Sequence, residues 1–207
     1  MRILYIDTSS SYLYSGIVQD NKLIASIKEN LGQELSCVAL PKIASMFEEN
    51  NMKPTDIDKI IVVNGPGSFT GIRVGLTIAK VYAWSLNIPI TTITSLEAMK
   101  ISCDYDGIVV SIIDARREYS YASIYDGEKC ILKPQHISNN QLTEILNRLD
   151  KYKIITNDDT SLPGQKCSYD PDILSIVNKY VEKESINPHL VNPEYLKLTE
   201  AEESRMQ

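Results

Sequence analysis

Residues 60–86 read IIVVN, GPGSFTGIRVG and LTIAKVYAWSL, and this stretch decides the fold. It predicts a buried strand, a glycine-rich turn and a long helix in direct succession. Four of the nine glycines of the chain lie here, at Gly65, Gly67, Gly71 and Gly75. Glycine at this density indicates positive φ angles or a close backbone approach that a Cβ atom would obstruct. Because helix N-termini of this kind often bind phosphate, the stretch is either a nucleotide loop or a support for a partner surface.

The glycine turn matches neither of the two common nucleotide motifs. It is not G-x-x-x-x-G-K-[ST], because Thr70 stands five residues after Gly65 and no Lys-Ser/Thr pair follows, and it is not G-x-G-x-x-G. The local pattern therefore favours a structural turn that joins strand to helix. The nucleotide-loop interpretation keeps four candidate residues, which are Asp7, Thr8, Gly65 and Gly67.

Composition and charge narrow the class of protein. The 207 residues are 43% hydrophobic and 23% charged, which is ordinary for a globular chain, and the net charge is −6. An acidic chain gains little attraction to a phosphate backbone, so direct nucleic-acid binding is not expected as its own role.

The N-terminus leads straight into a strand pattern without a signal peptide, which predicts a cytoplasmic protein without a membrane span. The four cysteines have no metal-binding spacing and are expected to be reduced thiols.

The chain divides into two halves of similar pattern. Each half begins with an apolar strand, an Asp-led polar turn (Asp7-Thr8-Ser9 or Asp114-Ala115-Arg116) and a returning strand, and then moves to helix. This predicts two α/β lobes, residues 1–101 and 102–207, joined by a polar hinge at 102–107. The first half is expected to hold strands at 2–6, 13–18, 22–28, 60–63 and 90–93, and helices at 33–49, 71–86 and 95–100. The second is expected to hold strands at 108–113, 118–125, 129–134 and 153–156, and helices at 139–149 and 171–184.

Catalytic chemistry has little support in the sequence. His136 and His189 lie in loop-like surroundings, and no Gly-x-Ser-x-Gly elbow is present. Asp7 and Asp114 could form a carboxylate couple across a cleft, although turn formation explains both residues more simply. No H-x-x-x-H or H-E-x-x-H motif occurs, so neither catalytic residues nor metal ligands are predicted.

The helix after the glycine turn is apolar around most of its circumference, which indicates burial on more than one side. Gly75, Ala79 and Ala83 leave a shallow groove that either the first helix of the same chain or another subunit fills. Trp84 or Tyr82 would anchor such a subunit. The predicted partner interface comprises Leu35, Val38, Ile72, Gly75, Leu76, Ala79, Tyr82 and Ala83.

Four blocks of sequence resemble the bacterial TsaB (YeaZ) family. They are GPGSFTGIRVG at 65–75, ILYIDTSS at 3–10, IDARREYSYASIY at 113–125 and NPEYLK at 192–197. The resemblance spans nearly the whole chain. It implies a two-lobed ASKHA fold (actin/Hsp70-like, ribonuclease H-like), with a mixed sheet and flanking helices in each lobe.

The resemblance also implies a function and a set of partners. It implies a noncatalytic scaffold subunit in the complex that forms threonylcarbamoyladenosine beside the anticodon of ANN-decoding tRNAs. A TsaD-like catalytic subunit would bind through the two long helices, with a TsaE-like ATPase joining a ternary complex. The free protein is expected to form a homodimer and to meet tRNA only indirectly. No cofactor is expected in the chain itself, although ATP or ADP at a partner interface is compatible with the resemblance.

The chain departs from the family pattern at three places. Gln33 and Glu34 follow Gly32 where the family often has His-Ser-Glu, Lys197 replaces the usual arginine, and the second lobe is short. Under the family interpretation, Ala79→Arg is expected to weaken the heterodimer and to leave the fold intact.

The alternative function is a small ASKHA-type ATPase or phosphotransferase that binds ATP in the interlobe cleft. A third possible function, protease activity, is not favoured, because the sequence shows no nucleophile–base pair.

Overall fold

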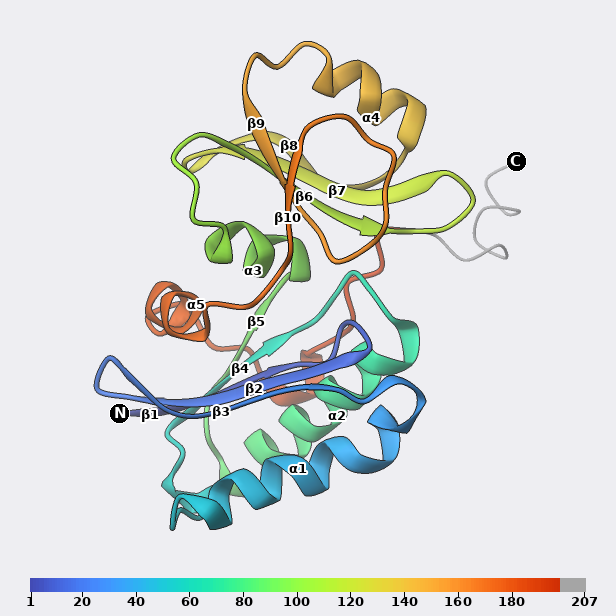
Figure 1. The fold of residues 1–207 in the computed structure, drawn as a ribbon. Helices are drawn as coiled ribbons and strands as arrows, with labels where there is room; N and C mark the ends of the chain where they lie inside the picture. Colours follow the sequence, from blue (N-terminus) through green and yellow to red (C-terminus); the bar gives the residue numbers. More distant parts are fainter. Residues whose placement is uncertain (198–207) are drawn as a thin grey trace.

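The computed structural model describes residues 1–197, and residues 198–207 of the expected second lobe lie outside the described part. Two five-stranded sheets are stacked with helices between them and on both outer sides (Figure 1). In the view of Figure 1, α1 and α2 lie beneath the first sheet, α3 and α5 lie between the sheets, and α4 lies above the second. The helices are α1 (Leu35–Glu49), α2 (Phe69–Leu86), α3 (Ser95–Ser102), α4 (Asn139–Leu146) and α5 (Ile173–Tyr180).

The two sheets share one topology. The first has the strand order β3-β2-β1-β4-β5, and the second has the equivalent order β8-β7-β6-β9-β10. In each, an antiparallel three-stranded meander continues into parallel strands. The two-lobed mixed-sheet fold is therefore confirmed. The strands are β1 (Arg2–Asp7), β2 (Tyr12–Gln19), β3 (Lys22–Asn30), β4 (Lys59–Val63), β5 (Ile90–Ile93), β6 (Ile108–Asp114), β7 (Tyr119–Asp126), β8 (Lys129–Ser138), β9 (Tyr152–Ile155) and β10 (Gln165–Cys167).

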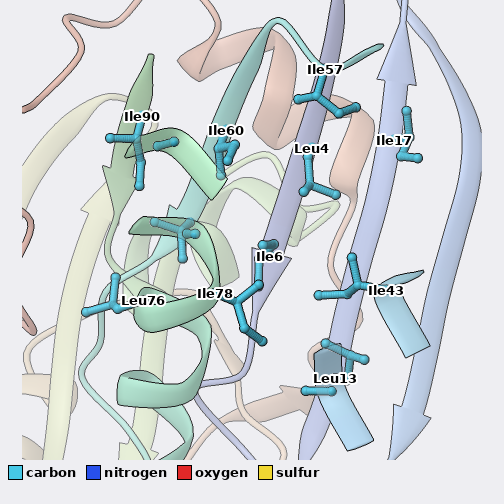
Figure 2. Close-up of a cluster of buried hydrophobic side chains, with 14 of the residues drawn as sticks. Leu4, Ile6, Leu13, Ile17, Ile43, Ile57, Ile60, Leu76, Ile78 and Ile90 are labelled. Atoms are coloured by element: carbon cyan, nitrogen blue, oxygen red, sulfur yellow. The ribbon is translucent and has the colours of Figure 1, made fainter. Parts of the chain in front are cut away.

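Strand β1 is buried on both faces and therefore reads as a continuous apolar run. Leu4 and Ile6 pack towards α1 and α2, as Figure 2 shows for the cluster around them. Ile3 and Tyr5 point to the opposite face and pack with α3 and α5. Because the side chains of a strand alternate, one short strand supplies two cores.

The core between the sheets crosses the expected lobe boundary at residue 101. It joins residues of the first sheet, α3, α5 and inward-facing residues of the second sheet, such as Val109 and Ile155. Helix α5 belongs to the second half of the sequence but contacts strands of the first sheet. The two lobes are thus packed together through a shared apolar layer.

Several element boundaries differ from the expected ones for local reasons. Helix α2 starts at Phe69, two residues early, because the Ser68 side chain accepts a hydrogen bond from Gly71 N–H and caps it. Helix α5 spans 173–180 instead of 171–184, with Asp172 as its cap. Strand β8 continues past Pro134 to Ser138, so His136 lies in a strand instead of a loop. The edge strand β10 was not predicted, since its three residues are too short to show a period.

The double-sided burial of β1 yields a first prediction. Ile6→Ala is expected to lower the free energy of unfolding by about 2–5 kcal/mol, because the cavity left in a closed core adds to the lost transfer energy. Ile24→Ala is the matched control, since Ile24 is 43% exposed on the edge strand β3; its cost is expected to stay below about 1 kcal/mol. Urea unfolding followed by circular dichroism measures both. Equal losses in the two variants would contradict the assignment of the core.

Candidate functional site

The glycine loop packs directly against the turn between β1 and β2. A Cβ atom on Gly71 would lie 2.1 Å from the backbone oxygen of Thr8, and one on Gly75 would lie 2.3 Å from Thr8 Oγ1. The approach allows Thr8 Oγ1 to donate to Gly71 O at 2.7 Å and Ser68 N–H to donate to Ser9 O at 2.7 Å. The glycines therefore bring the start of α2 into hydrogen-bond contact with the turn.

Asp7 is the last residue of β1, directly before this turn, and its carboxylate connects the two lobes by hydrogen bonds. Its carboxylate accepts from Ser9 N–H at 2.8 Å, from the Tyr169 hydroxyl at 3.2 Å and from the Tyr5 hydroxyl at 3.4 Å. Tyr169 comes from the second half of the chain, after β10. Burial raises the pKa of the Asp7 carboxyl above its usual range, while the hydrogen bond from Ser9 opposes the shift.

A cleft of about 900 Å³ opens between the lobes above these residues. Residues 9–12, Gly67–Thr70 and α3 form one wall, and residues 112–116, Tyr121, Asn157 and Asp158 form the other. Lys197 lies at the cleft from the C-terminal segment. Ser95 and Tyr169 contribute further polar groups. The cleft is a mixed surface of hydroxyls, aromatic rings, two cations and two carboxylates.

The nucleotide candidates do not assemble in this cleft. Asp7 and Thr8 are both 1% exposed, and Gly65 is buried as well. Of the four, only Gly67 lines the cleft. The Thr8 hydroxyl and the Asp7 carboxylate are bonded to the chain itself, so of the predicted nucleotide loop only Gly67 reaches the cleft.

Asp114 lies at the cleft but does not pair with Asp7 there. Its backbone N–H donates to Asp158 Oδ2 at 2.7 Å, and its Oδ1 accepts from Arg116 N–H at 3.0 Å. These bonds shape the turn between β6 and β7, as turn chemistry predicted for Asp114. Within residues 1–197, no group of three or more His, Cys, Asp or Glu side chains is arranged to hold a metal ion.

The turn after Asp114 contains strain that sequence reasoning missed. Arg116, Arg117 and Glu118 have φ angles of 64°, 52° and 61°, so three successive residues with side chains are left-handed. This conformation costs about 1–2 kcal/mol per residue. It places Arg116 at the cleft. Since neither glycine nor asparagine occurs in the turn, the sequence contains no signal for it.

Most of the predicted partner-interface residues are buried in the interior of the first lobe. Leu35, Ile72, Leu76, Ala79 and Ala83 are at most 4% exposed, and Gly75 is buried, while Val38 and Tyr82 are half-buried. Helix α1 lies against α2, where Phe47 and Tyr82 stack with ring centroids 6.4 Å apart. Gly75 faces Ile6 and Thr8 of the first lobe. The buried residues therefore form intramolecular core, which corrects their assignment to a surface.

The surface that remains on these helices carries different residues. We define the outer face by Val81 and Trp84 of α2, which are 54% and 65% exposed, while Leu40 of α1 is 47% exposed. Val81 and Trp84 are three residues apart and therefore neighbours on the helix surface. Of the two expected anchors, Trp84 is exposed and Tyr82 is half-buried. The ring of His189, in the segment that returns to this lobe, meets Trp84 edge-on at 6.3 Å.

The C-terminal segment crosses α2 at its other end. Arg73 lies over the Phe69 ring at 3.8 Å, and its Nε donates to the Tyr195 hydroxyl at 2.9 Å. Lys80 Nζ donates to Val191 O, and Glu194 N–H donates to Asn64 O. The NPEYLK block at 192–197 therefore holds the glycine loop and α2 from outside.

This arrangement defines the class of the protein: a two-lobed α/β protein of the ASKHA type, with the same sheet topology in both lobes. A structure titled "YeaZ from Pseudomonas aeruginosa" shares the fold with a TM-score of 0.76 at 18% identity, and covers 94% of this chain and 99% of that one. A second structure, titled as an uncharacterized protein of similarity to peptidase YEAZ from Pseudomonas aeruginosa, has a TM-score of 0.80 at 18% identity, with 95% and 99% coverage.

The sequence comparisons identify the family. The family model "TsaD: tRNA N6-adenosine threonylcarbamoyltransferase" matches residues 29–170. "tRNA threonylcarbamoyladenosine biosynthesis protein TsaB" of Bacillus subtilis is 33% identical, over 98% of this chain and 96% of the relative. The Escherichia coli protein of the same name is 31% identical over 48% of this chain and 42% of its own length. The chain belongs to the TsaB family.

Gly75 provides a test of the close contact between α2 and the turn. Gly75→Ala is expected to cost about 1–3 kcal/mol of unfolding free energy, because the new methyl group displaces Thr8 Oγ1 from its bond to Gly71. Helix propensity alone favours alanine over glycine by about 1 kcal/mol. A net loss of unfolding free energy would therefore come from the contact between residue 75 and Thr8. Thr8→Ala in the same chain removes the obstructing oxygen, and the double variant is expected to be more stable than Gly75→Ala. Additive losses in chemical unfolding would contradict the proposed clash.

The buried Asp7 carboxyl gives a pH-dependent prediction. Its pKa is raised, so between the ordinary pKa of about 4 and the native pKa the folded chain retains a proton that the unfolded chain releases. This contribution to stability is present below the ordinary pKa and is lost as the pH rises through the native pKa. Asp7→Asn should therefore gain stability relative to the unmodified protein as the pH rises from about 4 to 7.

The control for this pH series is Asp159→Asn, which makes the same chemical change at an exposed carboxylate. Urea unfolding at several pH values measures the difference in unfolding free energy for each variant. A difference for Asp7→Asn that stays constant, or that falls with rising pH, would contradict the raised pKa.

Proposed function

We propose that this chain is a noncatalytic scaffold and activator subunit of the complex that forms threonylcarbamoyladenosine beside the anticodon of ANN-decoding tRNAs. In this proposal it forms a heterodimer with a TsaD-like catalytic subunit. Membership of the TsaB family supports the pathway, since relatives in that family are named as threonylcarbamoyladenosine biosynthesis proteins. One structural observation supports the scaffold role, namely the outer face of α2.

The outer face has the properties of a docking surface. A tryptophan that is 65% exposed is costly to leave in water, and tryptophan is enriched among residues that dominate binding energies. The face rests on a rigid base, because the buried sides of both helices pack into the first core. A partner therefore meets a preorganised apolar surface, and little conformational entropy is lost on binding.

The interlobe cleft favours the scaffold over an ATPase. A phosphotransferase of this fold class would need the Asp7 carboxylate and the Thr8 hydroxyl at the cleft, and both are buried and bonded to neighbours. Calorimetry with Mg-ATP on the isolated chain separates the two functions. Binding below millimolar concentration together with ATP turnover would support the ATPase and oppose the scaffold.

The remaining partners follow from the same proposal. A TsaE-like ATPase joins the heterodimer in a ternary complex, ATP or ADP binds at a partner interface, and tRNA reaches this subunit only through the assembly. Without its partner, the chain covers the outer face by forming a homodimer. We place the protein in the cytoplasm; among helices of the described residues, none is long and apolar enough to cross a membrane.

Burial changes which substitution tests the interface. Ala79 is fully buried in the first core, so Ala79→Arg would place a charge there and unfold the protein instead of leaving the fold intact. Val81→Arg is the appropriate change, because Val81 is 54% exposed on the same helix and arginine is a good helix former.

Val81→Arg is expected to weaken the heterodimer with the TsaD-type counterpart at least about tenfold, because it puts a hydrated charge into a desolvated contact. Calorimetry or analytical size exclusion of the mixed proteins measures the change. Leu23→Arg is the matched control: Leu23 is 43% exposed on β3, away from the outer face, and binding should stay unchanged. A thermal melt checks that both variants are folded. Unchanged affinity for Val81→Arg, or no heterodimer with the unmodified chain, would overturn the proposal.

A further inference from the structure

Two cysteines from distant parts of the chain meet between the lobes. Cys103 Sγ lies 3.8 Å from Cys167 Sγ, although the residues are 64 positions apart in sequence. Both side chains are half-buried, whereas Cys37 on α1 and Cys130 on β8 are exposed. Within the described residues, the four thiols therefore divide into one contacting pair and two accessible single thiols.

The pair lies where the chain passes from the first lobe to the second. Cys103 is the first residue after α3, with its N–H bonded to Lys100 O, and it begins the connector that leads into β6. Cys167 ends the edge strand β10, where its Sγ donates to Ile154 O at 3.5 Å. Two residues later, Tyr169 reaches across to Asp7 of the first lobe. A bond between the thiols would tie the connector between the lobes to the strand that leads into this contact.

We propose that Cys103 and Cys167 form a reversible intramolecular disulfide, which makes the joint between the two lobes sensitive to the redox state of the surrounding thiol pool. The sulfurs are already in contact, so side-chain rotation at both residues can bring them to the bonding distance of about 2.05 Å. This inference rests on the contact between the thiols and is independent of the proposed function.

The oxidant in this proposal is a low-molecular-weight disulfide. One cysteine thiolate attacks a sulfur of the reagent, forms a mixed disulfide and releases one reagent thiolate. The second cysteine thiolate attacks the protein-bound sulfur and releases the other reagent thiolate. Two cysteine sulfurs are oxidised and two reagent sulfurs are reduced, and the two thiol protons pass to the released thiolates.

The surroundings keep this reaction selective and slow. Burial, followed by the neighbouring Cys167, raises the pKa of the Cys103 thiol to about 11, while the charge of Lys153 opposes this shift and that of Asp104 adds to it. A protonated, half-buried thiol reacts poorly with bulk reagents. Once one cysteine carries the mixed disulfide, however, the other is in place beside it, and the intramolecular step outcompetes a second attack from solution.

The test uses the full chain with Cys37→Ser and Cys130→Ser, which removes the exposed thiols and leaves the pair. The protein is incubated with oxidised glutathione, alkylated under denaturing conditions and analysed by intact mass and peptide mapping. The expected product is a monomer that has lost two hydrogens, with the peptides of Cys103 and Cys167 linked. Closure of so long a loop should raise the melting temperature by about 5 °C or more, and dithiothreitol should reverse the rise.

The control is Cys103→Ser in the same background. It should give no cross-link, carry at most one glutathione adduct on Cys167 and show no reversible rise in melting temperature. Two results would overturn the inference: alkylation of both cysteines after oxidation, or glutathione adducts on both cysteines without a linked peptide. A dimer linked through either residue would also overturn it, because the sulfurs would then have reacted between molecules.

Discussion

The contact between the β1–β2 turn and the start of α2 determines how the first lobe is arranged. Glycines at 71 and 75 allow the helix to approach until Thr8 Oγ1 bonds to Gly71 O, a separation that any side chain would prevent. That approach fixes the direction and rotation of α2. Ile72 and Ala79 consequently face the sheet and α1, while Val81 and Trp84 remain outside. The buried and exposed sides of the proposed docking helix are thus set by a backbone contact near its first turn.

The same turn also holds the two lobes together. Asp7 ends β1, and its carboxylate receives the hydroxyl of Tyr169 from the second half of the chain. The cost of burying a carboxyl group is partly offset by three hydrogen bonds and appears as a raised pKa. Together with the shared apolar layer of α3 and α5, this contact makes the lobes one packed body. The Asp7 carboxylate is therefore committed to holding the structure together.

Sequence reasoning predicted the two-lobed fold well, because β1, β4 and β6 are unbroken apolar runs next to Asp-led or glycine-rich turns. It failed to choose the correct side of α2. A helix that is apolar all round gives no indication of which face another part of the chain will cover, so Ile72, Leu76 and Ala79 were assigned to a surface. The left-handed turn at 116–118 has no glycine or asparagine to reveal it, and Asp114, which precedes it, accepts a hydrogen bond from Arg116 N–H. The Cys103–Cys167 contact depends on tertiary packing across 64 positions, which no local pattern encodes.

The position of the glycine loop bears on the proposed role of this chain as a platform. A phosphate-binding turn must keep its hydroxyl and amide groups open to the ligand. Here the Thr8 hydroxyl bonds to Gly71, Ser9 N–H bonds to Asp7, and Ser9 O accepts from Ser68 N–H. These groups cannot orient α2 and bind a phosphate at the same time. The same contact leaves Trp84 exposed at the outer side of α2, which supports the proposed recognition of a partner by the helix.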